Sequence, residues 1–258
     1  MKRILRGIAL VSIFAALLIP ATAFAGSGPT VIKSLPYTIS KPGDYTLAKS
    51  LTYNANRTDA ITITTDDVIL DLGGNCITGP GLATSAHHGI SIFGNGVEVR
   101  NGYIAGFFYG LFANNSISPK ASNLRVHDNL FGIDFESSAY GAEVKDCKVY
   151  TNGRTGIYVA AAGGIITNNV TYNNGTETSS YGINVNSGSC VIGNSSYHNT
   201  GIGVAAGDGC TVKNNSSFGN TETGIITFGT VLLDGNAASG NTPNYNLSAG
   251  TVSGTNTP

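Results

Sequence analysis

Cys147-Lys-Val-Tyr-Thr-Asn152 is the first copy of a six-residue phrase that decides how this chain folds. Four more copies follow, namely Asn169-Val-Thr-Tyr-Asn-Asn174, Asn194-Ser-Ser-Tyr-His-Asn199, Asn215-Ser-Ser-Phe-Gly-Asn220 and Asn236-Ala-Ala-Ser-Gly-Asn241. Successive copies begin 22, 25, 21 and 21 residues apart, and a period of this length indicates a solenoid of stacked coils. The phrase therefore predicts a repetitive, elongated fold.

A second marker recurs in step with the phrase, and it consists of a glycine followed by an aliphatic residue. Its copies are Gly89-Ile90, Gly110-Leu111, Gly132-Ile133, Gly156-Ile157, Gly182-Ile183, Gly201-Ile202 and Gly224-Ile225. Apolar residues then alternate with polar ones, as in Ile157-Tyr-Val159, and a period of two is typical of half-buried strands. Gly and Asn between the strands supply the left-handed backbone positions that sharp turns need.

The asparagines that open and close each phrase fall at equivalent positions of successive coils. When coils stack at strand spacing, each Asn lies over the Asn of the coil below. The side-chain amides can then form a hydrogen-bonded ladder that faces the interior of the solenoid. This arrangement predicts a parallel β-helix.

The repeats, together with Ile39-Ser-Lys-Pro-Gly-Asp-Tyr45 and Val68-Ile-Leu-Asp-Leu-Gly-Gly74, resemble the right-handed parallel β-helix proteins of the pectate-lyase-like superfamily over residues 36–247. The resemblance implies an all-β, single-stranded right-handed parallel β-helix of about eight coils of roughly 19–29 residues, with an Asn ladder. That superfamily contains lyases, epimerases, glycoside hydrolases, phage tailspikes, adhesins and proteins without known activity. The resemblance therefore specifies the fold, and the function has to be argued from individual side chains.

The first 25 residues are expected to form a signal peptide. Lys2, Arg3 and Arg6 precede an apolar run over residues 8–19, and Ala23-Phe-Ala25 offers small residues for cleavage after Ala25. We therefore expect a secreted, periplasmic or extracellular protein that is not held in a membrane after cleavage. Cleavage removes three basic residues and changes the formal net charge from −1 to −4, which makes nucleic acid and anionic lipid unsuitable partners.

The rest of the chain is expected to form one elongated domain. Residues 26–58 are out of phase with the repeats and are interpreted as an N-terminal cap, in which Tyr37–Ile39 and Tyr45–Leu47 form a hairpin. Residues 59–247 form the β-helix, and residues 248–258 form a flexible polar tail. No cap is legible at the C-terminal end, so an open sheet edge there could pair with another copy in head-to-tail self-association.

Four cysteines follow the signal segment, and they are Cys76, Cys147, Cys190 and Cys210. Cys147 occupies a ladder position and is interpreted as a small buried residue. Cys190 and Cys210 lie on adjacent coils about one residue out of register, so whether they form a disulfide stays open. The Cys and His spacings match no metal site, no cofactor is evident, and the acidic residues do not cluster as Ca²⁺ ligands do.

Charged residues concentrate in residues 98–154. They are predicted to form two outward columns along the stack, Glu98, Arg125 and Glu143 in one, and Asp71, Arg100, His127 and Lys145 in the other. In one hypothesis Arg100 and Lys145 bind the carboxylates of a uronate polymer, while His127 acts as general base and Arg125 assists catalysis. The alternative is a solvated face whose charges form ion pairs, each worth under about 1 kcal/mol.

A second candidate site lies on the strand that follows Gly132. Asp134 and Glu136 are two residues apart and therefore point to one side, with Phe112 and Tyr158 at neighbouring positions of adjacent coils. Rings that stack on sugar faces, beside carboxylates that transfer protons, are characteristic of sugar-processing grooves. In this hypothesis Asp134 and Glu136 are catalytic, and Phe112 and Tyr158 bind substrate. The alternative is that the two acidic side chains only keep an exposed strand soluble and unpaired.

Catalytic signatures of the superfamily are absent from the sequence, including Asp-Pro-His-Asp of the mannuronan epimerases, Gly-His-Gly of the polygalacturonases and Arg-x-Pro-x-x-Arg of the calcium pectate lyases. We therefore expect an exported protein that binds polysaccharide, either a uronate-containing polymer or a cell-surface glycan. A lyase, epimerase or hydrolase of acidic polysaccharide is one alternative, and a non-catalytic structural or adhesive surface protein is another. The largest departures from the repeat, residues 116–123 and 176–180, are short for the walls of a catalytic groove.

Overall fold

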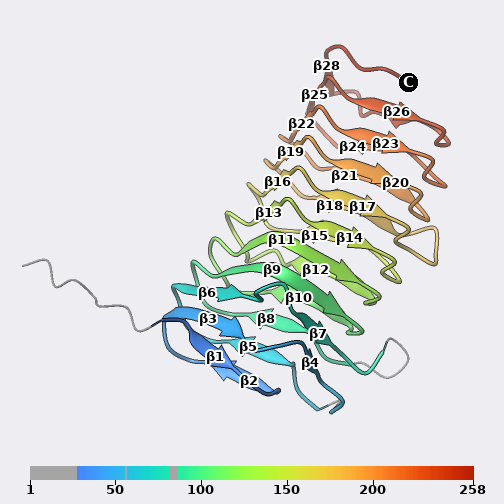
Figure 1. Cartoon of the computed structure of the whole chain (residues 1–258). Helices are drawn as coiled ribbons and strands as arrows, with labels where there is room; N and C mark the ends of the chain where they lie inside the picture. Colours follow the sequence, from blue (N-terminus) through green and yellow to red (C-terminus); the bar gives the residue numbers. More distant parts are fainter. Residues whose placement is uncertain (1–27, 56, 82–85) are drawn as a thin grey trace, which may run out of the picture.

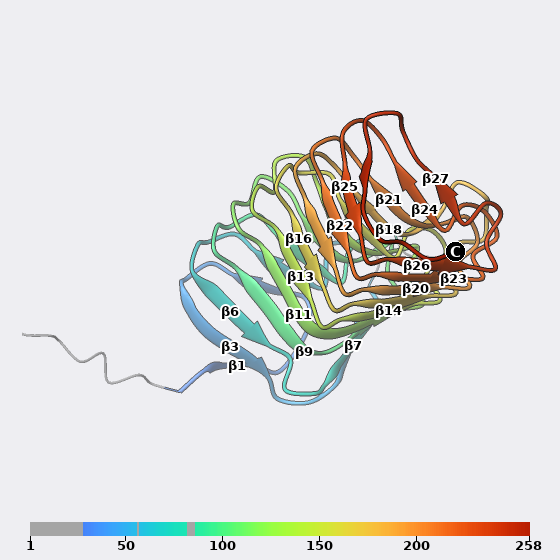
Figure 2. The same ribbon diagram turned by 90° about the horizontal axis from the view of Figure 1, so that it is seen from above.

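The computed structural model is an elongated right-handed solenoid of parallel β-strands, and it describes residues 28–55, 57–81 and 86–258. Every strand pairing is parallel, and no helix occurs among the described residues. The coils stack along one axis, with the N-terminal strands at one end and the C-terminal strands at the other (Figure 1, Figure 2). The predicted all-β parallel β-helix is confirmed, whereas the predicted signal peptide at residues 1–25 lies outside the described residues.

The coils contribute strands to three faces of the solenoid. The first face is a 10-stranded sheet of β2 (Tyr37–Ile39), β5 (Ile61–Ile63), β8 (Ile90–Ile92), β10 (Tyr109–Ala113), β12 (Phe131–Phe135), β15 (Ile157–Val159), β18 (Tyr181–Val185), β21 (Ile202–Ala206), β24 (Ile225–Thr227) and β27 (Tyr245–Asn246). These ten strands mark ten coils, against the eight or so expected.

The second and third faces form a single 18-stranded sheet because β9 (Glu98–Ala105) and β11 (Lys120–His127) run from one face to the other. The second face also contains β1 (Thr30–Ile32), β3 (Gly43–Leu47), β6 (Val68–Asp71), β13 (Glu143–Lys145), β16 (Ile165–Thr167), β19 (Cys190–Ile192), β22 (Thr211–Lys213), β25 (Leu232–Asp234) and β28 (Val252–Ser253). The third face also contains β4 (Leu51–Thr52), β7 (Cys76–Thr78), β14 (Lys148–Tyr150), β17 (Val170–Tyr172), β20 (Ser195–Tyr197), β23 (Ser216–Phe218) and β26 (Ala237–Ser239).

Residues in the left-handed conformation bend the chain between faces. The bend from the second face to the third uses, at φ of 49–57°, Asn101, Asn123, Asp146, Asn168 and Asn214. The bend from the third face to the first uses, at φ of 51–54°, Asp128, Thr151, Asn173 and His198. Asn and Asp visit this conformation more readily than most residues because their short polar side chains can hydrogen-bond locally.

Each of the two bends is followed by a ladder of asparagines, as the six-residue phrase predicted, and the ladder is buried except at its C-terminal end. The first ladder continues from Cys147 through Asn169, Asn194, Asn215, Asn236 and Asn256, and the second consists of Asn129, Asn152, Asn174, Asn199, Asn220 and Asn241. In one step, the backbone N–H and Nδ2 of Asn169 donate to Oδ1 of Asn194 at 2.8 and 3.0 Å, and Nδ2 of Asn194 donates to the Ile166 carbonyl at 2.9 Å. The ladders thus satisfy backbone groups that the bends leave unpaired.

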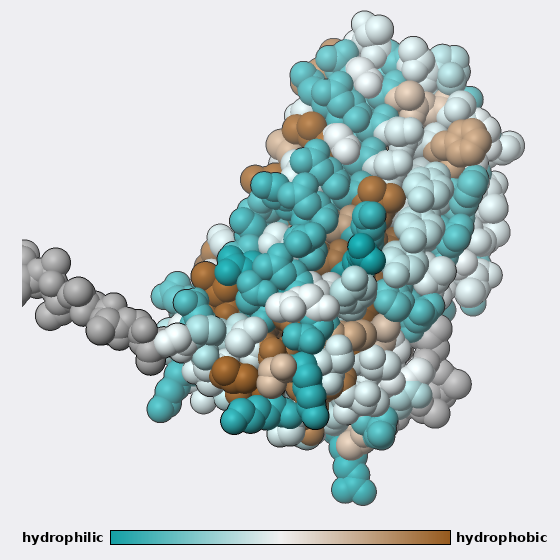
Figure 3. All heavy atoms as spheres, in the orientation of Figure 1, coloured by the Kyte–Doolittle hydropathy of each residue, from teal (hydrophilic) through white to brown (hydrophobic). Residues whose placement is uncertain are grey.

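Aliphatic side chains that alternate with the outward residues fill the interior. One continuous inward column, entirely buried, consists of Ile61, Ile90, Leu111, Ile133, Ile157, Ile183, Val204 and Ile225. Burial of one such side chain contributes about 1.5–3 kcal/mol relative to exposure. The outside seen in Figure 3 is mostly hydrophilic, with hydrophobic residues as separated patches.

The marker glycines lie where the first face passes close to the second Asn ladder. A Cβ on Gly156 would come within 2.8 Å of the Gly182 carbonyl and 2.9 Å of Nδ2 of Asn174. In the coil that follows Gly182, the glycine at the marker position is Gly203 and not the predicted Gly201 of Gly201-Ile202. The register places Val204, the residue after Gly203, opposite Ile183. The repeated glycine therefore reflects a close approach of backbone to a ladder amide.

The four cysteines are free in this structure. Cys147 is buried, as predicted, and its backbone N–H donates to Oδ1 of Asn169 at 2.9 Å. Cys190 lies opposite Thr211 and is partly exposed, whereas Cys210 is buried in the interior, where its Sγ accepts from the Ser189 N–H at 3.3 Å. The disulfide left open by the sequence does not form because these two side chains lie on opposite sides of the coil wall.

The predicted N-terminal hairpin is wrong. β2 pairs in parallel with β5 on the first face, and β3 pairs in parallel with β1 and β6 on the second, so β2 and β3 are strands of one coil. The turn at Pro42-Gly43 connects two faces and does not fold the strands back on each other. At the other end β28 pairs with β25, and Thr257 bridges to Ala237, so residues 252–257 extend the second and third faces.

Candidate functional site

The residues singled out from the sequence lie on three different faces of the solenoid. Arg100 and Lys145 are on the second face, and Arg125 and His127 are on the third. The two predicted charged columns are wrong, because Lys120 and Ser122 of β11 occupy the places assigned to Arg125 and His127, opposite Glu98 and Arg100. The first face carries Phe112, Asp134, Glu136 and Tyr158 and is the one that brings its candidates together.

The charges of the second face form ion pairs. Arg100 Nε lies 2.9 Å from Asp71 Oδ2, Lys120 Nζ lies 3.4 Å from Glu143 Oε2, and Lys145 Nζ lies 3.8 Å from Asp146 Oδ2. Burial by itself raises the pKa of Asp71, but hydrogen bonds from the Gly73 N–H and Asn101, together with Arg100, make the net shift downward. This face therefore matches the alternative of a solvated surface with weak ion pairs, each worth under about 1 kcal/mol.

On the first face, outward side chains of successive coils line up in register as Ser91, Phe112, Asp134, Tyr158 and Asn184. Asp134 and Glu136 line a cavity of about 280 Å³ whose other walls are Tyr109, Phe131, Thr155, Tyr158, Tyr181 and Asn184. A second cavity of about 440 Å³ shares Tyr158, Tyr181 and Asn184 and continues along the solenoid to Asp208 and Phe228. We call the two together the first-face groove.

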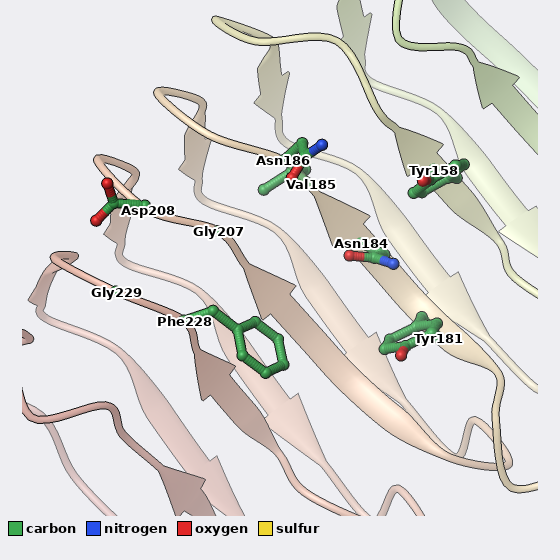
Figure 4. Close-up of a pocket in the computed structure, with 9 residues that line it drawn as sticks. All are labelled: Tyr158, Tyr181, Asn184, Val185, Asn186, Gly207, Asp208, Phe228 and Gly229. Carbon is green, nitrogen blue, oxygen red and sulfur yellow. The ribbon is translucent and has the colours of Figure 1, made fainter.

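Figure 4 shows how the first-face groove is built from strands in succession. Tyr158 projects from β15, Tyr181 and Asn184 project from β18, and Phe228 follows β24. The side chains that line this cavity therefore come from successive coils along the solenoid axis.

Asp134 is the unusual group in the groove. Its side chain points outward, yet only 4% of the residue is exposed, because aromatic rings of neighbouring strands surround it. Its Oδ1 has no hydrogen-bond partner among the described residues. Burial, together with the nearby negative charge of Glu136, raises the pKa of Asp134 to about 7. Burial of Tyr109, together with the negative charges of Asp134 and Glu136, raises the pKa of its hydroxyl group to about 12.

A partly buried polar cluster supports the N-terminal end of the groove. Ser91 Oγ donates to Asp59 Oδ2 at 2.6 Å and lies 2.9 Å from His88 Nδ1. The His88 ring packs on Tyr109 and Phe112, at centroid distances of 5.0 and 4.6 Å. Burial lowers the pKa of His88, against the opposing charge of Asp59. Because Ser91 is fully buried, this cluster orients the aromatic wall and presents no nucleophile to the groove.

Sequence reasoning missed Tyr109, Phe131 and Tyr181, which line the groove beside Asp134. Each of them directly precedes a marker glycine, as Tyr109-Gly110, Phe131-Gly132 and Tyr181-Gly182. An aromatic residue at the same position in three coils is therefore a sequence pattern that could have identified these groove residues. It marks the start of the strands on the first face, where the rings cover the outward residue three positions later.

The chain matches one known protein family over much of its length. The family described as "Right handed beta helix region" matches residues 41–195, which is more than half of the chain. This protein belongs to the right-handed β-helix family. The family membership agrees with the parallel three-faced solenoid and with the superfamily resemblance that the repeats indicated.

Solved structures share the fold of this right-handed β-helix at low sequence identity. The Dettilon tailspike protein is 15% identical with a TM-score of 0.56, and the match covers 84% of this chain and 60% of that one. The periplasmic alginate epimerase AlgG is 13% identical with a TM-score of 0.60, over 84% of this chain and 68% of that one. Pectate lyase Pel9A is 13% identical with a TM-score of 0.56, over 83% and 69%. The chain thus spans three fifths of the tailspike's length, and a search of curated proteins found no match.

Two kinds of feature were not found among the described residues of this right-handed β-helix, a metal-binding cluster and a membrane-spanning helix. Among the residues that the structure describes, no three His, Cys, Asp or Glu side chains come together in a way that could hold a metal ion. A search of the same residues also found no helix with the length and hydropathy needed to cross a membrane.

Proposed function

We propose that this protein is exported and binds polysaccharide along the first-face groove. The observation that carries the proposal is Asp134, a buried carboxyl group with an unpaired Oδ1 that opens into a cavity walled by aromatic rings. An unsatisfied buried polar atom costs about 1–3 kcal/mol, and a ligand hydroxyl that hydrogen-bonds to it would recover that free energy. Aromatic rings beside it offer flat apolar surfaces on which sugar rings stack.

The length of the groove favours a polymer over a single sugar. Its two cavities share Tyr158, Tyr181 and Asn184 and extend from Phe131 to Phe228 across the strands of the first face. Two of the proteins with a similar fold are named as an alginate epimerase and a pectate lyase, which supports polysaccharide as the ligand class. The predicted signal peptide at residues 1–25 supports a location outside the cytoplasm, where such polymers occur.

Retention of the purified mature protein on immobilised polysaccharides tests the binding proposal. A panel of alginate, pectate and neutral polymers, with and without calcium, identifies the polymer class. Tyr158→Ala and Tyr181→Ala should each weaken retention about tenfold, since loss of an aromatic anchor typically costs more than 1 kcal/mol. Tyr140→Ala is the matched control because Tyr140 is 56% exposed and lies outside the groove. Equal retention of all three variants would contradict the proposal.

Catalysis is the second candidate function, and the raised pKa of Asp134 favours it. A carboxyl group with a pKa of about 7 is protonated in a large fraction of molecules near neutrality, so it can donate a proton to a leaving oxygen. Glu136 lines the same cavity and supplies the second carboxyl group that glycoside cleavage uses. New reducing ends or unsaturated products that disappear in both Asp134→Asn and Glu136→Gln would establish an enzyme. Retention without turnover would leave a binding protein.

A further inference from the structure

The third face carries an aromatic ladder whose N-terminal end is not covered by another ring of the described residues. The ladder consists of His127, Tyr150, Tyr172 and Tyr197, whose ring centroids lie 4.8, 4.9 and 5.1 Å apart with interplanar angles of 13°, 5° and 2°. Each inner ring is covered on both faces by its neighbours. A ligand ring can therefore stack only at an end of the ladder.

At the N-terminal end the ladder stops while the strands continue. The register places Ala105 next to His127, and Thr78 next to Ala105, so two further coils carry small side chains at the ladder position. A cavity of about 570 Å³ occupies this place, lined by Cys76, Thr78, Ala105, Gly106, His127 and Asp128 among others. We call it the ring slot. Tyr150 covers one face of His127, and the opposite face of His127 borders the ring slot.

The His127 ring is held in place before any ligand arrives. His127 Nδ1 lies 2.8 Å from Asp128 Oδ2, and Asp128 Oδ1 accepts a hydrogen bond from Thr151 Oγ1 at 2.9 Å. With Tyr150 stacked behind it, the imidazole has a fixed orientation. A fixed stacking surface loses little conformational entropy when a ring binds.

A cation, Arg125, lines a separate cavity together with Tyr103, and the strand neighbour of Tyr103, Cys76, lines the ring slot. Arg125 is two residues before His127 on β11, so both side chains point outward from the third face. Its guanidinium lies over the Tyr103 ring, 5.1 Å from the centroid, and Tyr103 is likewise two residues before Ala105. The ion pairs found among the described residues do not include Arg125, which is exposed. Its charge is thus available to an anionic group on a ligand in the ring slot.

We propose that the ring slot is a second glycan site that binds the pyranose ring of a sugar acid. The apolar face of the pyranose stacks on His127 where the next ring of the ladder would lie, and the sugar carboxylate pairs with Arg125. The slot is on the third face, so it is separate from the first-face groove and takes one terminal ring, whereas the groove takes a chain. This proposal does not depend on the function of the groove.

Cys76 provides a direct measurement of occupancy because it lines the ring slot and is partly exposed. The experiment alkylates the native mature protein with iodoacetamide and follows each cysteine by peptide mass spectrometry. Galacturonic acid and its trimer are the ligands, and galactose is the neutral counterpart. At about ten times Kd, alkylation of Cys76 should slow about tenfold. Cys190 is the internal control, because it is partly exposed on the second face and should react at an unchanged rate.

Two variants separate the parts of the proposal. Ala105→Phe fills the ring slot with a ring in register with the ladder, so Cys76 should be shielded from iodoacetamide without ligand and show no further protection. Arg125→Gln should abolish the preference for galacturonic acid over galactose, with Cys76 still reactive in the free protein. Tyr158→Ala, in the first-face groove, should leave protection of Cys76 intact even if it removes polymer retention.

Three results would overturn the proposal. The ring slot is no glycan site if no sugar changes the reactivity of Cys76 up to high millimolar concentration. The role of the acid is wrong if galactose and galacturonic acid protect Cys76 equally in the unaltered protein. The location is wrong if Ala105→Phe, folded by its melting temperature, leaves Cys76 reactive and still protected by galacturonic acid.

Discussion

Asp134 points outward, yet it is buried, and one of its carboxyl oxygens has no hydrogen-bond partner among the described residues. The rings that bury it come from other strands, since Tyr109 lies on β10 and Tyr158 on β15. An unpaired buried carboxylate is costly, so the proton remains bound to a higher pH than in water. The residue is therefore held in a state that a ligand can relieve.

Asp134→Asn should change how stability depends on pH. The pKa of Asp134 is about 7 in the folded protein against 3.8 ordinarily, so between these values the folded state keeps a proton that the unfolded chain has lost. The contribution of this group to the free energy of unfolding is therefore fully present below about pH 4 and decreases as pH rises towards 7. Asn cannot ionise, so the free energy of unfolding of the variant should rise relative to that of the unaltered protein as pH increases across this window. The difference should reach a few kcal/mol at most.

Urea unfolding of the two proteins from pH 3.5 to 8 measures this difference. The low-pH end is the internal control, because there both side chains are neutral and of similar size. A difference in unfolding free energy that stays constant over the whole range would show that Asp134 is not held protonated by its surroundings.

At the scale of a single element, the Asn ladder explains why the coils stack in one register. Asn194 Oδ1 accepts from the backbone N–H and Nδ2 of Asn169, and its own Nδ2 donates to the Ile166 carbonyl and to Oδ1 of Asn215. One side chain thus satisfies buried groups of the coils on both sides of its own. Slippage by one residue would break all four hydrogen bonds at once.

Asn194→Ala should destabilise the protein by about 3 kcal/mol or more, because it leaves several buried donors and acceptors without partners, each worth about 1–3 kcal/mol. Asn246→Ala is the matched control, since Asn246 is exposed on β27 and should change stability by no more than about 0.5 kcal/mol. Thermal and urea unfolding compare the two variants. Equal small effects would show that the ladder amides contribute nothing beyond what water supplies.

The six-residue phrase was sufficient to predict the ladders, the parallel stacking and the burial of Cys147, because a ladder residue repeats at a fixed interval. It was not sufficient where the interval changes. Residues 116–123 look like an insertion in sequence, yet residues 120–122 form the first part of β11, which moved Arg125 and His127 onto another face. Alternation also showed that Asp134 points outward, but its burial depends in part on Tyr109 and Tyr158, which lie on other strands and whose distance from it is set by stacking and not by chain order.

At the scale of the whole molecule, the three faces keep separate chemistries apart. The second face carries ion pairs, the first carries the groove around Asp134, and the third carries the aromatic ladder with Arg125 and the ring slot. The two proposed glycan sites would allow a polymer chain and a chain end to be held at once.

The C-terminal end of the solenoid has the features of an adhesive edge. β27 pairs with β24 and β28 with β25, and no other strand of the described residues pairs with either. Val252 on β28 is 62% exposed, and the first coil at the opposite end also presents an exposed apolar residue, Val31, on β1. Within the described residues, the end strands β1, β2, β27 and β28 each pair with one strand only, and parallel edges of this kind favour head-to-tail contact between copies.

We expect the mature chain to associate reversibly as its concentration rises, and Val252→Lys to reduce this association, because a lysine on an edge strand opposes pairing with another strand. Ile165→Lys is the control, since Ile165 is 46% exposed on β16 in the middle of the second face, where both strand edges are already paired. Light scattering over a range of concentrations follows the mass of the two variants and the unaltered chain. If edge pairing drives association, only Val252→Lys lowers the mass, because both substitutions add the same charge. A constant monomer mass at high concentration would instead show that the last coil is closed to a second copy.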